Sequence, residues 1–241
     1  TVPHDWAIYG PFSSLNDKQE VAISQDGQKE AMEHAGRTGG LPFVGVGWYR
    51  TEFDVPQFQA GKRATILFDG AMSHANVYIN GQKVGYWPYG YNSFHFDITK
   101  YLKPGEKNTL AVRLENLPES SRWYPGAGLY RNVHLIITED AYIPVWGTYI
   151  TTPSVNEKFA KVNVRTKVVL PEGADPAKYS VETSVWNPNK QKLTAVRTSL
   201  AQMKYNNNQA EQEFVIQTPS LWSPEMPALY SAETRLYEGD K

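Results

Sequence analysis

The 241-residue chain contains no cysteine, which excludes disulfide bonds and thiolate metal sites. It also lacks an apolar run approaching the roughly 20 residues that a membrane-spanning helix needs. Lysine and arginine total 24 against 25 aspartates and glutamates, so the formal net charge is only -1. With charges this evenly balanced, the chain has no excess of positive charge to attract nucleic acid or a membrane surface, and we expect neither partner.

The missing cysteines leave the cellular compartment open, because exported bacterial proteins often lack cysteine too. No signal peptide is visible in the hydrophilic start, Thr-Val-Pro-His-Asp-Trp. We expect a processed chain whose parent protein is periplasmic or extracellular.

Aromatic residues are abundant, with 7 Trp, 15 Tyr and 9 Phe. Large aromatic side chains favour strands, and they also supply flat faces on which sugar rings stack. We expect most of them in the cores of β-sandwiches, with a smaller number at binding surfaces.

Short alternating runs of apolar and polar residues recur from Gly47 onward, about every 8–12 residues, as in a β-sandwich. The strongest hairpin signal is Asn80-Gly81, because both central residues of a type I′ turn need positive φ. The strands predicted in this half are 48–55, 63–69, 75–80, 83–86, 93–98, 109–115 and 131–138.

The pattern resets near 139–144, and six strands over about 100 residues then fit an immunoglobulin-like sandwich. Trp222 and Tyr230 are expected to pack within it. The only candidate helix, 17–34, has no apolar stripe, so we interpret it as an insertion that is functional or mobile. The sequence therefore predicts an all-β fold of two sandwiches in series, residues 1–140 and 141–241. The strands predicted in the second half are 145–151, 161–170, 179–186, 193–201, 213–217 and 229–237.

Residue patterns for catalysis or metal binding are missing. The five histidines show no ligand spacing, so no zinc site is indicated. There is no nucleophile elbow, P-loop or Rossmann glycine pattern. Glycoside hydrolysis needs two carboxylates about 5–10 Å apart, and nothing marks two acidic residues as such a pair. We expect no cofactor and no self-sufficient catalysis, while calcium or sodium held by backbone oxygens stays open.

Three loop regions combine aromatic faces, hydrogen-bonding groups and glycine: residues 3–16, 36–47 and 120–135. This composition suits a surface that binds polyols, since loops held by a rigid scaffold carry function. The alternative is that the glycines only form sharp corners and the aromatics fill the core. The residues alone leave both interpretations open.

Several short motifs occur in one order along the chain, and together they resemble family 2 glycoside hydrolases, the β-galactosidase, β-glucuronidase and β-mannosidase group. Each motif is weak alone, but their order covers nearly the whole chain. The motifs are Pro3-His4-Asp5-Trp6, Gly47-Trp48-Tyr49-Arg50, Phe68-Asp69-Gly70, Val77-Tyr78-Ile79-Asn80-Gly81, Phe96-Asp97-Ile98-Thr99, Gly128-Leu129-Tyr130-Arg131-Asn132-Val133 and Pro219-Ser220-Leu221-Trp222.

The resemblance implies that residues 1–140 are a jelly-roll sugar-binding domain and 141–241 an immunoglobulin-like domain that stops before its last strand. In this family the catalytic glutamates lie on a (β/α)₈ barrel that follows. We therefore expect the non-catalytic N-terminal portion of a glycosidase, most closely a β-galactosidase, that shares its carbohydrate substrate with a downstream barrel. A homo-oligomer of the full-length enzyme stays open. The alternatives are an autonomous carbohydrate-binding module with a spacer, or a structural or adhesive pair of sandwiches.

The resemblance also suggests residues that contact substrate. Arg122 and Trp123 are expected at the rim of the sugar site, with an interdomain contact as the alternative. A well-known family member has an acidic sodium ligand near the position of Arg122, which puts sodium binding at this site in doubt. Asn16 and Asp17 lie where the first loop of the family approaches sugar. Asp5 is expected to hold that loop through an Asx-type hydrogen bond. We expect Trp6, beside Asp5, to pack in the core.

Overall fold

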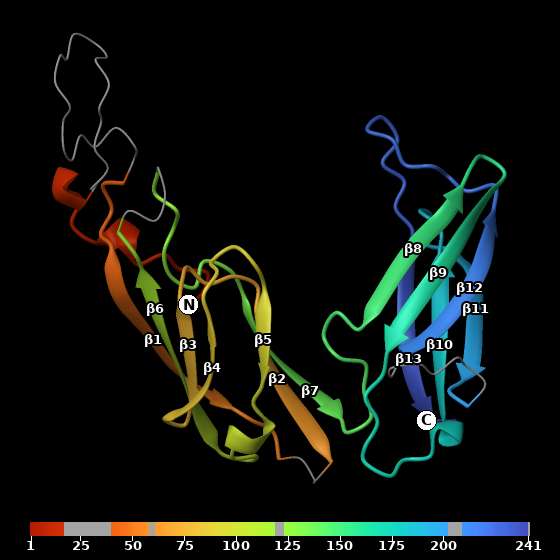
Figure 1. Cartoon of the computed structure of the whole chain (residues 1–241), viewed down its shortest axis with the longest axis horizontal. Helices are drawn as coiled ribbons and strands as arrows, with labels where there is room; N and C mark the ends of the chain where they lie inside the picture. Colours follow the sequence, from red (N-terminus) through yellow and green to blue (C-terminus); the bar gives the residue numbers. More distant parts are fainter. Residues whose placement is uncertain (17–39, 58–60, 119–122, 202–208, 241) are drawn as a thin grey trace. The chain divides into compact units, whose positions relative to one another are not determined.

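The computed structural model describes residues 1–16, 40–57, 61–118, 123–201 and 209–240 (Figure 1). These residues form strands and short 3₁₀ turns but no α-helix, so the prediction of an all-β chain with two sandwiches is confirmed. The segment 17–34, predicted to be an insertion, lies outside the described residues. In the described part, no helix is long and apolar enough to cross a membrane. The chain divides into two compact units, Thr1–Ile137 (unit 1) and Thr138–Lys241 (unit 2).

Unit 1 consists of two sheets. The larger has the strand order β1-β6-β3-β4 and the smaller the order β5-β2-β7. Antiparallel pairs join β1 to β6, β6 to β3 and β3 to β4, and the β3–β4 pair has a register shift between Val77 and Tyr78. The strands are β1 (Gly45–Asp54), β2 (Lys62–Phe68), β3 (Ala75–Ile79), β4 (Gln82–Trp87), β5 (Phe94–Asp97), β6 (Lys107–Asn116) and β7 (Val133–Glu139).

The turn between β3 and β4 confirms the hairpin predicted at Asn80-Gly81. Asn80 has φ 50° and Gly81 has φ 81°, as a type I′ turn requires. The Asn80 side chain also ties the turn to β6, because its Oδ1 accepts from the Thr109 N–H at 2.9 Å. Its Nδ2 donates to Oδ1 of the fully buried Asn108 at 2.8 Å. The turn chemistry therefore fixes both the hairpin and the neighbouring strand.

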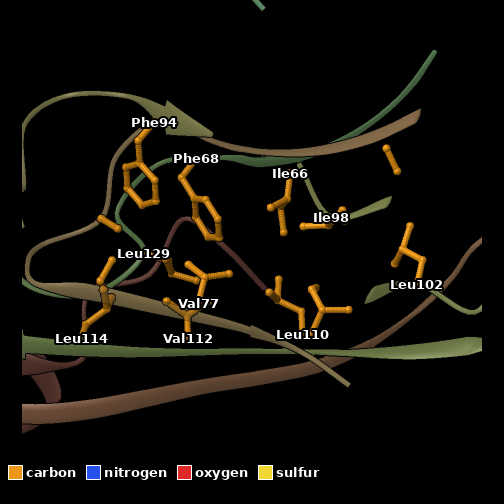
Figure 2. Close-up of a cluster of buried hydrophobic side chains, with 14 of the residues drawn as sticks. Ile66, Phe68, Val77, Phe94, Ile98, Leu102, Leu110, Val112, Leu114 and Leu129 are labelled. Atoms are coloured by element: carbon orange, nitrogen blue, oxygen red, sulfur yellow. The ribbon is translucent and has the colours of Figure 1, made fainter. Parts of the chain in front are cut away.

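The core of unit 1 lies between its two sheets (Figure 2). Phe68 stacks on Phe94 with ring centroids 4.8 Å apart, and both rings are almost fully buried. Val77 and Val112 project toward them from the larger sheet. Trp6 packs against the same cluster, as the sequence predicts. Full burial of a large apolar side chain stabilises a fold by about 1.5–3 kcal/mol, so this core supplies a rigid scaffold for the loops.

Unit 2 also consists of two sheets, with the strand orders β12-β9-β8 and β11-β10-β13. Its buried apolar cluster is small and is formed by Val168, Tyr179, Val181, Leu200 and Ala210. The expectation that Trp222 packs in this sandwich is wrong, because its side chain is 59% exposed. The strands are β8 (Thr148–Val155), β9 (Phe159–Lys167), β10 (Tyr179–Trp186), β11 (Lys192–Ser199), β12 (Gln209–Gln217) and β13 (Ser231–Glu238).

Candidate functional site

Loops from distant parts of the sequence meet at one end of unit 1, the upper end in Figure 1. The N–H of His4 donates to the Leu129 carbonyl at 2.8 Å, and the Tyr91 hydroxyl donates to the Pro125 carbonyl at 3.1 Å. These bonds join the N-terminal loop and the loop between β4 and β5 to residues 123–129. A contiguous loop surface therefore forms on the rigid sandwich, which is where ligand sites commonly occur.

Asp5 is the central residue of this loop surface. Its Oδ1 accepts from the Ala7 N–H at 2.9 Å, which confirms the predicted Asx-type bond. Its Oδ2 accepts from the Tyr124 hydroxyl at 2.5 Å and from the Ala127 N–H at 3.2 Å. Both carboxylate oxygens are thus engaged within the chain. Asp5 positions residues 123–128 relative to the N-terminal loop.

The surroundings of Tyr124 keep its hydroxyl protonated. Burial raises the pKa of Tyr124 well above 10.0, and the hydrogen bond to Asp5 and its negative charge raise it further. A neutral phenol donates to the carboxylate, whereas a phenolate would repel it. The Asp5–Tyr124 bond therefore persists across the ordinary pH range.

Tyr49 anchors the start of the same loop. Its hydroxyl donates to the His4 carbonyl at 3.0 Å and accepts from Nδ1 of His4 at 2.8 Å, which places the imidazole proton on Nδ1. The ring of His4 stacks on Tyr9, with centroids 5.4 Å apart and planes 8° from parallel. Burial is the main reason that the pKa of Tyr49 is raised.

Gly128 lets these loops approach one another. Its φ is +89°, and a Cβ at this position would overlap the Tyr49 hydroxyl and the His4 carbonyl. Its N–H and carbonyl form two hydrogen bonds with the backbone of Met72, at 3.0 and 2.9 Å. Only glycine meets both the conformational and the steric requirement here.

The predicted site residues divide into three groups. Trp123 is 61% exposed on the loop that Asp5 positions. Asn16 uses both N–H groups of its amide within the chain, donating to the Pro11 carbonyl at 3.0 Å and to the Leu41 carbonyl at 2.8 Å. Arg122 and Asp17 lie outside the described residues. The structure therefore joins Asp5 to the segment that carries Trp123, while Asn16 shapes its own loop.

The contacts that hold the surface together were not predicted from the sequence. Tyr124, Tyr91 and Gly128 make the contacts that join the loops. The hydrogen-bond partner of Tyr91 lies 34 positions away in the chain, and that of Tyr124 lies 119 positions away. The one available signal was Gly128 itself, inside a glycine-rich corner. No local pattern reveals which distant carboxylate or carbonyl a tyrosine will reach.

A groove of about 610 Å³ also opens in unit 1, lined by residues of β1 and β7 among others. Its lining is mainly apolar and includes a single carboxylate, Asp54. A glycosidase needs two carboxyl groups, so this groove carries no acid/base pair of its own. Across the described parts of the chain, no three His, Asp or Glu side chains gather closely enough to hold a metal ion.

Comparison with known proteins accounts for both units. The family model "Glycosyl hydrolases family 2, sugar binding domain" matches residues 41–139, and the model "Glycosyl hydrolases family 2" matches residues 142–241. The chain belongs to glycosyl hydrolase family 2. The resemblance stated from the sequence motifs is thereby confirmed.

Relatives in this family are much longer than the chain. It is 37% identical over 241 residues to a β-galactosidase of Bacteroides ovatus and covers 26% of that protein. It is 35% identical over 242 residues to a putative β-glucuronidase of Formosa agariphila, of which it covers 21%. In both cases all of this chain is matched. The 241 residues thus correspond to about a quarter of these proteins.

A solved family 2 member from Bacteroides cellulosilyticus superposes on the whole chain with a TM-score of 0.82 at 31% identity, and 30% of that structure is covered. A β-glucuronidase structure from Bacteroides uniformis gives a TM-score of 0.75 at 26% identity, with 99% of this chain and 26% of that structure covered. The all-β units described above are therefore the shared N-terminal architecture of family 2 glycosidases.

Proposed function

We propose that the chain is the non-catalytic N-terminal portion of a longer β-glycosidase, most closely a β-galactosidase, that hydrolyses O-glycosidic bonds. A (β/α)₈ barrel elsewhere in the longer protein supplies the two catalytic glutamates. The observation that carries this proposal is the uninterrupted match of all 241 residues to a β-galactosidase more than three times as long. The lack of a recognisable carboxylate pair in the 610 Å³ groove is consistent with it.

Within this enzyme, the loop surface of unit 1 forms one wall of the sugar site. Trp123 offers an exposed aromatic face to a pyranose ring, and Arg122 beside it supplies guanidinium donors for hydroxyls or a carboxylate. Asp17, next to Asn16, belongs to the same proposed wall. Asp5 contributes by positioning, because its oxygens are engaged by Ala7, Tyr124 and Ala127.

The first test compares two proteins. The longer gene product should hydrolyse nitrophenyl β-galactoside, and the 241-residue chain should not. Hydrolysis by the isolated chain would overturn the assignment of catalysis to another domain. A longer protein that is inactive on both nitrophenyl galactoside and glucuronide would overturn the proposed activity.

The second test concerns Trp123 in the longer enzyme. Loss of a stacking contact worth about 1–2 kcal/mol should lower kcat/KM roughly 5- to 30-fold for Trp123→Ala. Trp222→Ala is a matched control, since Trp222 is exposed to a similar extent on unit 2. Equal kinetics for the Trp123 variant and the unchanged enzyme would remove Trp123 from the wall.

A further inference from the structure

Four side chains form a row across the outer face of the larger sheet in unit 1. Tyr86 on β4 pairs with Asn76 on β3, Asn76 pairs with Arg113 on β6, and Arg113 pairs with Trp48 on β1. Residues paired across antiparallel strands project from the same face. We call these four residues the outer row.

Alternation along the strands shows that the row faces away from the core. The neighbours of Asn76 on β3, Ala75 and Val77, are fully buried, as are Val112 and Leu114 beside Arg113. Successive side chains in a strand point to opposite faces. The ends of the row are accordingly exposed, 59% for Trp48 and 46% for Tyr86.

Both aromatic ends of the outer row are held in place by a neighbour. Trp48 packs against Tyr78, with ring centroids 5.7 Å apart and planes tilted by 35°. The Tyr86 hydroxyl forms a 2.6 Å hydrogen bond with Nδ1 of His74. Side chains fixed in this way lose little additional conformational freedom when they bind a ligand.

The middle of the row is polar and its charges are balanced. Asn76 donates from Nδ2 to the His74 carbonyl at 3.2 Å. Arg113 donates from Nη1 to Oε2 of Glu115 at 3.0 Å. In the described part of the chain, Oδ1 of Asn76 and the other guanidinium N–H groups of Arg113 make no further hydrogen bond, so they remain available to a ligand. The ion pair leaves the row without a net charge.

We propose that the outer row binds a short neutral oligosaccharide, with one pyranose ring on Trp48 and another near Tyr86. Three strand spacings, about 14 Å, separate the backbones of the two aromatic residues, which is longer than a single sugar ring and suits an extended chain. Amide and guanidinium groups between them match the hydroxyl groups along the edges of such a chain. This site goes beyond the proposed hydrolytic function and does not depend on it.

Two other occupants fit the outer row less well. A polyanion would find the positive charge of Arg113 already neutralised by Glu115. A protein partner would have to desolvate Asn76 and the Arg113–Glu115 ion pair, which lie between the two aromatic ends. Alternating aromatic faces and hydrogen-bonding groups instead suit a ligand with apolar ring faces and polar edges.

The test is calorimetric titration of the 241-residue chain with β-1,4-linked galactotetraose and xylotetraose, alongside galactose and glucuronate as single sugars. At least one tetrasaccharide should bind, and the single sugars should bind at least tenfold more weakly. Trp48→Ala and Tyr86→Ala should each weaken tetrasaccharide binding tenfold or more. Trp222→Ala, at an exposed tryptophan of unit 2, should leave it unchanged, and Trp123→Ala reports whether the loop wall binds the tetrasaccharide instead.

Three outcomes of the titration would overturn the proposal: no binding of either tetrasaccharide, binding that survives both Trp48→Ala and Tyr86→Ala, or binding abolished by Trp123→Ala instead. Circular dichroism of each variant confirms that the fold is retained. Amide hydrogen exchange of the longer protein tests whether another domain covers the outer row. Strong protection of residues 46–50 and 83–87 relative to the 241-residue chain, without sugar, would show that another domain occupies the row, contrary to the proposal. Activity on nitrophenyl glycosides is measured separately, so failure here is distinct from failure of the proposed hydrolysis.

Discussion

The two units join their sheets by different means. Among the described residues of unit 1, fifteen buried apolar side chains form one cluster between the sheets, which includes the stacked rings of Phe68 and Phe94. Among those of unit 2 the corresponding cluster has five residues, and a buried glutamine adds hydrogen bonds between the sheets. Gln212 on β12 accepts from the Thr183 hydroxyl at 2.6 Å and donates to the carbonyls of Val181 and Val196 at 3.1 and 2.9 Å.

This difference has an energetic meaning. Apolar burial is non-directional, so the core of unit 1 tolerates small adjustments and supports loops of varied shape. The Gln212 network is directional, and removing the amide would take one hydrogen bond from the Thr183 hydroxyl and from the carbonyls of Val181 and Val196. The contact between the sheets of unit 1 therefore depends on the volume of its buried side chains, whereas that of unit 2 depends also on where the Gln212 amide lies.

The largest expected effect is at the centre of the unit 1 core. Phe68→Ala should lower the free energy of unfolding by about 3–5 kcal/mol, because it removes a buried ring and leaves a cavity. Amide hydrogen exchange, analysed for each unit separately, should show faster exchange throughout unit 1 and little change in unit 2. The control Phe12→Ala, at an exposed phenylalanine, should change stability by less than about 0.5 kcal/mol. Similar effects for the two variants would contradict an apolar core centred on Phe68.

The next effect is in unit 2. Gln212→Ala should cost about 2–3 kcal/mol, since it removes buried hydrogen bonds to the Thr183 hydroxyl and to two strand carbonyls. The matched control is Gln209→Ala, an exposed glutamine on the same strand, which should be nearly neutral. If denaturant unfolding gave the same midpoint for both variants, the glutamine network would not be what joins the sheets of unit 2.

A smaller effect is expected at the loop surface of unit 1. Asp5→Ala and Tyr124→Phe should each cost about 1 kcal/mol, and their combination should cost less than the sum because both remove the same hydrogen bond. Exchange should accelerate in residues 123–128 while the strands keep their protection. Strictly additive losses would show that the two side chains do not act together.

The smallest effect at neutral pH concerns four partly or fully buried tyrosines, and this effect grows as the pH is raised. Burial is the first cause of the raised pKa values of Tyr49, Tyr124 and Tyr130 in unit 1 and of Tyr179 in unit 2. A raised folded pKa means that the native state holds protons that the unfolded chain releases near pH 10. Stability is therefore unaffected well below pH 10 and falls as the pH rises above it.

Because the described part of unit 1 has three such tyrosines and that of unit 2 has one, hydrogen exchange between pH 8 and 11, corrected for the intrinsic rate, should show unit 1 opening first. Tyr124→Phe should reduce the pH dependence of unit 1 and leave that of unit 2 unchanged. Parallel loss of protection in both units would contradict this ranking of the tyrosines.

Local features of the chain were predictable from the sequence. The hairpin at Asn80-Gly81 follows from two residues that tolerate positive φ, and the strands follow from alternation with turn residues between them. The Asx-type bond from Asp5 spans two residues, so it too was within reach. Each of these depends on neighbours in the chain.

Long-range contacts were not predictable in the same way. Asp5 and Tyr124 are 119 positions apart, and Thr183 and Gln212 lie on strands of different sheets. At Trp222 a buried position was predicted that the structure does not contain. Its size suggested a core position, but it lies exposed in the segment between β12 and β13. Hydrophobicity alone does not say which large apolar side chain finds space between two sheets.

By itself, then, the sequence determined the all-β class, the turn at Asn80-Gly81 and membership of glycosyl hydrolase family 2, because strand periodicity, turn conformation and ordered motifs are local properties. Only the tertiary structure decided that Asp5 joins the N-terminal loop to Tyr124 and Ala127 and that Trp48 and Tyr86 end one row across four strands. The physical reason is register: the pairing of strands, which long-range packing selects, determines which side chains share a surface.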